Sequence, residues 1–143
     1  MKYFPTLICV LTLFVMNAQD KTEQALPYSE IPDYPEAYTA GTVVSRMIDG
    51  LGFRYYWATE NLSKTDLDYR PGADSRSVEE TLDHILGLSR VILNSAVQRP
   101  NDRSTVSGET LSFLEKRSQT LLNLEQASLV FLKSDTLEDH AIV

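Results

Sequence analysis

The sequence predicts an all-α protein that folds as one antiparallel helical bundle. Three long segments carry apolar residues at steps of three and four, which is the period of a helix that buries one side. No segment shows the strict alternation that is typical of a half-buried strand. The chain has 143 residues, of which 43% are hydrophobic, so it can bury a core within a single domain.

The first helix is expected over residues 39–62. Gly50 and Gly52 fall in its middle, and each weakens a helix by roughly 1 kcal/mol relative to Ala. They therefore indicate either the close approach of another helix or a kink. The apolar residues that define this helix are Val43, Val44, Met47, Ile48, Leu51, Tyr55, Ala58 and Leu62.

The second helix is expected over residues 77–97, after an irregular loop at 63–76 that contains a Pro-Gly turn. Ser77 and Glu80 form a Ser-x-x-Glu capping box, in which the two side chains satisfy free backbone N–H groups of the first turn. The apolar residues of this helix cover more than one side. Such a helix favours packing against two partners, as in a bundle of four.

The third helix is expected over residues 107–133, with Lys133 where a cation suits the negative end of the helix dipole. Only ten residues follow Lys133, so we expect three helices of the bundle with the fourth missing, as in the front part of a longer protein. One apolar stripe should then stay open, which makes a homodimer the candidate assembly. The expected buried stripe consists of Leu111, Leu114, Leu121, Leu124, Leu129 and Leu132.

Residues 1–19 are expected to be a secretory signal peptide. Lys2 precedes an apolar run of 13 residues, FPTLICVLTLFVM, which is shorter than the roughly 20 residues of a membrane-spanning helix. We expect cleavage near Ala18 or Gln19, and the alternative is an uncleaved N-terminal anchor. Cleavage would place the mature protein in the periplasm or outside the cell.

Residues 20–37 are expected to form an extended N-terminal arm that precedes the bundle at 38–143. Three prolines lie among polar and acidic residues of this segment, and it shows no helical or strand period. Tyr28 and Tyr34 are the candidates for pinning the arm to the bundle.

Composition excludes several classes of partner and chemistry. The formal net charge is -7, and the 13 Lys and Arg residues do not cluster, so neither nucleic acid nor an anionic membrane surface is an expected partner. Cys9 is the only cysteine and lies inside the signal peptide. The mature chain therefore has no thiol for a disulfide, a zinc site or a nucleophile, and no stable membrane anchor is expected.

Residues 46–92 contain three short motifs: the loop Leu67-Asp68-Tyr69-Arg70-Pro71, the helix entry Arg76-Ser77-Val78, and Leu82-Asp83-His84-Ile85 on the second helix. With these motifs the segment resembles the DinB-like superfamily of bacterial four-helix-bundle proteins. The resemblance covers about a third of the chain, and the third helix matches only in length and pattern.

The resemblance implies an up-down-down-up bundle that holds a divalent metal, Zn or Ni, through three histidines. His84 matches the ligand position on the second helix, so His84 is the metal candidate. The two other ligands form a His-x-x-x-His pair on the fourth helix, and this pair is absent from the sequence. Because one imidazole is too few ligands for either metal, these 143 residues are not expected to hold one tightly.

Taken without the resemblance, His84 is either a metal ligand or a hydrogen-bonded core histidine. His140, the only other histidine, follows Glu138 and Asp139 in a polar tail and is expected to be solvated. The sequence contains no Gly-rich phosphate loop and no nucleophile elbow. The catalytic residues therefore stay unknown, and no cofactor-binding residue is predicted.

Two hypotheses for function follow. The first is a metal-dependent enzyme of the DinB-like type that acts on a small-molecule substrate, with the metal as Lewis acid. The second is a metal-free helical binding or structural module of the cell envelope. A His-x-x-x-His pair encoded beyond Val143 would favour the first hypothesis, and a stop codon there would favour the second.

Overall fold

A computed structural model describes residues 25–101, 111–138 and 140 of the chain. The expected signal peptide, the first residues of the expected arm and residues 107–110 of the third predicted helix lie outside this described part. The described residues contain helices and no strand, which confirms the all-α prediction. The elements are α1 (Ala40–Ala58), α2 (Lys64–Asp68), α3 (Val78–Ala96) and α4 (Phe113–Phe131).

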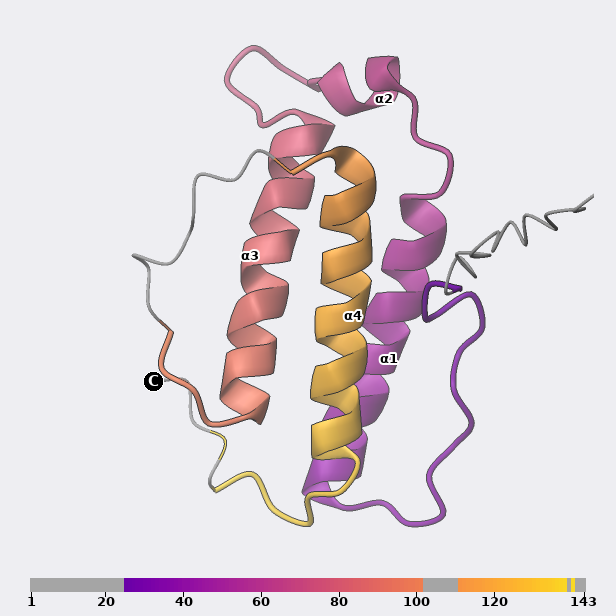
Figure 1. Cartoon of the computed structure of the whole chain (residues 1–143), viewed down its shortest axis with the longest axis vertical. Coiled ribbons are helices and arrows are strands. Elements are labelled where there is room, and N and C mark those ends of the chain that lie inside the picture. The colour runs from indigo at the N-terminus through magenta and orange to yellow at the C-terminus, as the bar shows by residue number, and fades with distance from the viewer. Residues whose placement is uncertain (1–24, 102–110, 139, 141–143) are drawn as a thin grey trace, which may run out of the picture.

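The three long helices pack with α4 between α1 and α3 (Figure 1). The start of α4 lies at the end of α1, where Arg117 Nε donates to Thr59 Oγ1 over 3.0 Å, so these two helices are antiparallel. The start of α4 also lies at the start of α3, where Lys116 Nζ is 3.2 Å from Glu79 Oε1, so α3 and α4 are parallel. The expectation of antiparallel neighbours is therefore correct for α1 with α4 and wrong for α3 with α4.

The length of the connection explains the parallel pair. A helix of 19 residues such as α3 is roughly 28 Å long at 1.5 Å per residue. The chain between Ala96 and Phe113 can extend by about 3.3 Å per residue, which is more than enough to return to the end at which α3 begins. A short connection would have forced α4 to run the other way.

Local capping signals set the helix boundaries. Each helix begins after a residue whose side chain accepts a backbone N–H of the first turn, and the predicted capping box of Ser77 and Glu80 is present. The expectation of an irregular loop over 63–76 is wrong at Lys64–Asp68, which forms α2. This short helix has a capping box of its own, in which Ser63 and Asp66 bond each other's backbone N–H groups.

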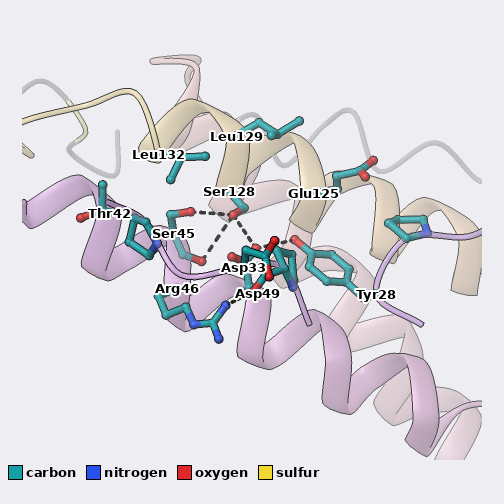
Figure 2. A pocket seen from close by; sticks show the side chains of 13 residues that line it. Tyr28, Asp33, Thr42, Ser45, Arg46, Asp49, Glu125, Ser128, Leu129 and Leu132 are labelled. Atoms are coloured by element: carbon teal, nitrogen blue, oxygen red, sulfur yellow. Dashed lines mark hydrogen bonds between the residues drawn. The ribbon is translucent and has the colours of Figure 1, made fainter. Parts of the chain in front are cut away.

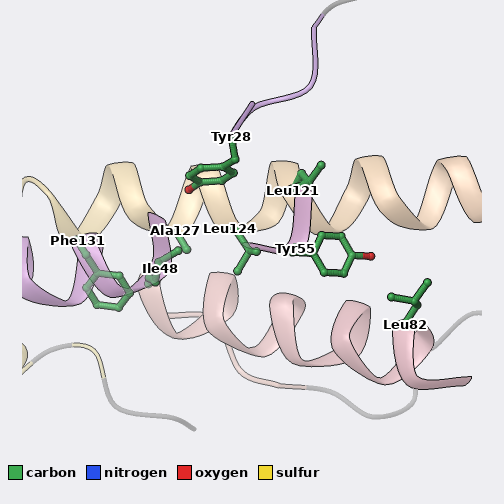
Figure 3. Close-up of a cluster of buried hydrophobic side chains, with 9 residues drawn as sticks. Tyr28, Ile48, Tyr55, Leu82, Leu121, Leu124, Ala127 and Phe131 are labelled. Carbon is green, nitrogen blue, oxygen red and sulfur yellow. The ribbon is translucent and has the colours of Figure 1, made fainter. Parts of the chain in front are cut away.

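One apolar cluster joins the three long helices (Figure 3). On α4, Leu121 and Leu124 are fully buried as predicted, whereas Leu114, Leu129 and Leu132 are exposed, so the expected leucine stripe is wrong in part. The buried surface of α4 is formed instead largely by smaller and polar residues. The reason is that α4 packs against two helices at once, and close contacts between helices favour small side chains. The buried residues of α4 include Thr120, Ala127, Ser128 and Phe131.

The C-terminal tail packs against the ends of α3 and α4. The expectation that His140 is solvated is wrong: its ring centroid lies 4.8 Å from that of Phe131, and its Nε2 is 3.1 Å from Ser134 Oγ. The backbone carbonyl of His140 also accepts a 2.8 Å hydrogen bond from Ser95 Oγ. The aromatic surface of Phe131 thus gives the tail an apolar contact that its polar sequence does not reveal.

One side of α1 carries exposed apolar residues. Val43, Met47 and Leu51 follow each other at steps of four and are 46%, 70% and 42% exposed. This is the open stripe expected from a bundle of three long helices. None of the helices within residues 25–101 and 111–140 has both the length and the apolar character that crossing a membrane requires.

The N-terminal arm lies across α1, and Gly52 is the position that lets it approach. The described part of the arm, residues 25–37, is irregular as expected, and Tyr28 is buried against the helix. A Cβ atom built on Gly52 would lie 2.5 Å from ring carbons of Tyr28. The glycine pair thus does mark a close approach at Gly52, but the expectation of a second helix is wrong there, because the element that approaches is the arm.

We predict that Gly52→Ala displaces the arm, because the added methyl group overlaps the Tyr28 ring. Trp57 is the only tryptophan, and its Nε1 donates to the arm carbonyl of Ser29 over 3.2 Å, so its fluorescence emission should shift to longer wavelength.

The matched control is Gly87→Ala on α3, where a Cβ meets nothing within 4 Å. This change should leave the Trp57 emission unchanged and stabilise the protein by up to about 1 kcal/mol in thermal denaturation. An unchanged emission in Gly52→Ala would contradict the arm position.

Candidate functional site

A cavity of about 180 Å³ lies between the N-terminal arm, α1 and α4 (Figure 2). Such a volume corresponds to roughly six water molecules at about 30 Å³ each. The arm supplies Tyr28 and Asp33, and the helices supply polar groups on one wall and Leu129 and Leu132 on another. The cavity therefore has the mixed polar and apolar lining of a small-molecule site.

Asp49 of α1 is the central charged group of this cavity. The residue is only 7% exposed, and its Oδ1 accepts hydrogen bonds from Tyr28 Oη at 3.2 Å and from Ser128 Oγ at 2.5 Å. Its other oxygen, Oδ2, accepts no hydrogen bond from the described residues and belongs to a residue that lines the cavity. The buried carboxylate thus keeps one oxygen available to a ligand.

No cation of the described chain forms an ion pair with Asp49. Arg46 lies one turn away on α1 and also lines the cavity, but its guanidinium contacts the N-terminal arm. Its Nη1 donates to the backbone carbonyl of Pro32, and its Cζ lies 4.3 Å from the centre of the Tyr34 ring. Burying a carboxylate without a cation is costly, because the neighbouring dipoles replace only part of its hydration.

The hydroxyl protons around Asp49 are all used. Tyr28 and Ser128 each have one hydroxyl proton and donate it to Asp49 Oδ1. Ser45 Oγ lies 2.8 Å from Ser128 Oγ, and since Ser128 has given its proton to the carboxylate, Ser45 is the donor of that bond. The polar wall therefore presents oxygen lone pairs to the cavity and no free hydroxyl proton.

The Tyr28 hydroxyl remains a donor over the whole physiological range. Burial of the ring, followed by the nearby negative charge of Asp49, raises the pKa of the Tyr28 hydroxyl well above its ordinary value. Both causes disfavour the tyrosinate, because its charge would be desolvated and would repel the carboxylate. The Tyr28 hydroxyl therefore keeps the proton that it donates to Asp49.

A second buried charge, Arg117 on α4, has a different environment. It is 8% exposed, and its Nε and Nη2 donate to Thr59 Oγ1 and to the Tyr56 carbonyl, both over 3.0 Å. Its Cζ also lies 4.5 Å from the centre of the Tyr56 ring. These contacts bind the end of α1 to the start of α4, which indicates a structural role.

The structure places the predicted metal residue, His84, away from this cavity. His84 is exposed on α3, so the alternative of a hydrogen-bonded core histidine is wrong for the described residues. Leu82 and Leu86, two residues to either side, are buried in the core, and two residues turn a helix by about 200°. Within the described residues, no group of three His, Cys, Asp or Glu side chains could hold a metal ion.

Asp49, Ser45 and Ser128 are not among the site residues predicted from the sequence. A usable signal was present, because Ser45, Asp49 and Gly52 are spaced by four and three residues and so share one side of α1. A side made of small and acidic residues beside an apolar stripe indicates contact with another segment. Tyr28 is a predicted contact between the arm and the bundle, and its burial at 5% exposure confirms that prediction.

We predict a pH dependence of stability that belongs to Tyr28. In the unfolded chain a tyrosine loses its proton above about pH 10, whereas the folded protein holds it to higher pH. The folded state then binds more protons than the unfolded state, so the free energy of unfolding should fall as pH rises beyond about 10, by up to about 1.4 kcal/mol per pH unit.

The comparison is with Tyr28→Phe, which lacks the hydroxyl and should show a shallower fall over the same range. Chemical denaturation of both proteins, followed by circular dichroism between about pH 9 and pH 11, measures the two slopes. Parallel slopes would show that the Tyr28 hydroxyl is not held in the folded state as described.

Comparisons with known proteins assign no function to this cavity. No family model, no curated protein and no solved structure matches the chain. Among the described residues, the Asp49 carboxylate at the edge of the cavity is the feature that bears most directly on function.

Proposed function

We propose that the protein is a helical binding module that holds a small molecule in the cavity between its N-terminal arm, α1 and α4. The observation that carries this proposal is the Asp49 carboxylate, which is 7% exposed and lines the cavity. No cation of the described residues pairs with it. A bound molecule that supplies hydrogen-bond donors would offset the cost of burying this charge.

The arm gives the site its second wall. Tyr28 donates to Asp49, Trp57 of α1 donates to the carbonyl of Ser29, and Arg46 donates to the carbonyl of Pro32. These bonds connect the arm to one helix at three places, and two of the acceptors are backbone carbonyls. An irregular segment held in this way can open and close over a small ligand at a modest cost in free energy.

The alternative is that Asp49 only anchors the arm. An anchor needs acceptor oxygen for Tyr28 and Ser128, and Oδ1 alone supplies it. A neutral side chain would do the same work without the desolvation cost of a charge. The charge and the adjoining cavity therefore favour binding over anchoring.

We predict that filling the cavity abolishes binding. Leu129 lines the cavity and is 50% exposed, so Leu129→Phe should occupy the space without disturbing the core. The matched control is Leu88→Phe on α3, where the residue is 48% exposed and lies outside the cavity.

The measurement is a ligand-observed NMR titration with amines, alcohols and carboxylates of about four to six heavy atoms, a size set by the cavity. At least one class should bind saturably to the wild type and to Leu88→Phe, and the binding should be lost in Leu129→Phe. If no class binds, or if Leu129→Phe binds as well as the wild type, the proposal fails.

A metal-dependent enzyme of the DinB-like type is the second candidate. The observation that favours it is the order of directions of the long helices, since α1 is antiparallel to the parallel pair α3 and α4, as in the first three helices of an up-down-down-up bundle (Figure 1). This candidate needs a fourth helix with a His-x-x-x-His pair and a rearrangement that brings His84, which is exposed here, toward it.

Metal analysis tests this candidate. If it is correct, a form of the protein that extends past Val143 with such a pair should purify with about one equivalent of Zn or Ni, and His84→Ala should lose it, because three imidazoles fill the protein's share of such a site. His140→Ala is the control and should retain the metal. Absence of metal from the extended protein, or full retention in His84→Ala, would remove the candidate.

A further inference from the structure

We infer that the cavity beneath the arm selects a small organic cation with a primary ammonium group, bound through Oδ2 of Asp49. This inference rests on the proposed binding function and names the chemical class of its ligand. It depends on three features of the cavity wall: the direction of its hydrogen bonds, the signs of its charges and the placement of its apolar residues.

The direction of the hydrogen bonds in the cavity wall favours a ligand that is rich in donors. Tyr28 and Ser128 each donate a hydroxyl proton to Asp49 Oδ1, and Ser45 donates its own to Ser128 Oγ. What they leave toward the cavity is acceptor capacity, together with the unbonded Oδ2 of Asp49. An ammonium group has three N–H donors and no lone pair, so it complements a wall that presents acceptors.

The charges of the cavity wall also favour a cationic ligand. Besides Asp49, the cavity is lined by the carboxylates of Asp33 and Glu125. Among the described residues that line the cavity, Arg46 is the only cation, and its guanidinium contacts the carbonyl of Pro32 and the ring of Tyr34. The resulting negative potential attracts a cation and repels a carboxylate ligand.

The apolar residues set the shape of the ligand. Leu129 of α4 and Leu132, which directly follows the end of this helix, both line the cavity. A cation with a short alkyl chain can therefore place its ammonium group on Asp49 and its chain against the leucines. The cavity of about 180 Å³ has room for an amine of about five heavy atoms, but a bulky ligand would displace the arm.

The test compares three probes of nearly equal size: n-butylammonium, n-butanol and butyrate. Ligand-observed NMR titration of the full 143-residue chain should give n-butylammonium an affinity at least about tenfold higher than that of n-butanol, because hydrogen bonds to a charged group are among the strong ones. Butyrate should bind more weakly than either of the other two probes.

Asp49→Asn is the decisive variant, because it keeps the shape of the side chain and the acceptor Oδ1 for Tyr28 and Ser128. It should lower the affinity for n-butylammonium at least about tenfold and leave that for n-butanol within about twofold. Asp68→Asn is the control for the change in net charge, since Asp68 is exposed on α2 and pairs with Lys64, and it should leave both affinities unchanged.

The outcomes separate this inference from the proposed function. If the three probes bind alike, or if Asp49→Asn retains the preference for n-butylammonium, the cation inference is overturned, while loss of that binding in Leu129→Phe would still support the binding module. If neither these probes nor any of the wider classes bind, the proposed function and the inference both fail. Circular dichroism melting of each variant confirms that it is folded.

Discussion

The hydrogen bond between Tyr28 and Asp49 is the contact on which the architecture of the site depends. It joins the N-terminal arm to α1 at a point where both residues are almost fully buried. The ring of Tyr28 reaches this point only because Gly52 has no side chain. Without this contact the arm would lose its buried anchor, and the space between arm and helices would open to solvent. The absence of a side chain at one position of a helix thus allows the arm to form one wall of the cavity.

Two charged side chains, Asp49 and Arg117, are buried at the α1–α4 interface. They differ in how completely their polar atoms are satisfied by the protein, and only Asp49 suggests a ligand. The Arg117 guanidinium is enclosed by the Tyr56 carbonyl, the Thr59 hydroxyl and the Tyr56 ring. Asp49 has neutral partners on one oxygen only and lies at the wall of a cavity. A low-dielectric site strengthens every charged contact that is made and penalises every one that is missing. Within the described residues, Asp49 Oδ2 has no hydrogen-bond donor. A ligand that supplies such a donor would therefore gain more binding free energy at Asp49 than at Arg117.

Features that depend on neighbouring residues could be predicted from the sequence, and features that depend on distant residues could not. The capping box of Ser77 and Glu80 involves four consecutive positions, and it begins α3 as predicted. Gly52 indicated a close approach, but the residue that approaches, Tyr28, is 24 positions earlier and no local pattern names it. The burial of Asp49 follows from the same contact. For that reason the helices could be located from their periodicity, whereas the cavity required the arm to be placed.

Separate use of the two Asp49 oxygens couples ligand binding to closure of the arm. Tyr28 and Ser128 bond Oδ1, so a cation on Oδ2 would not compete with the arm for its acceptor. The cation would also relieve the cost of the buried charge, and that cost is highest when the arm excludes water. Ligand binding and arm closure should then favour each other by the same free energy, as linkage requires. An open arm would admit the amine and a closed arm would retain it, with one carboxylate serving both.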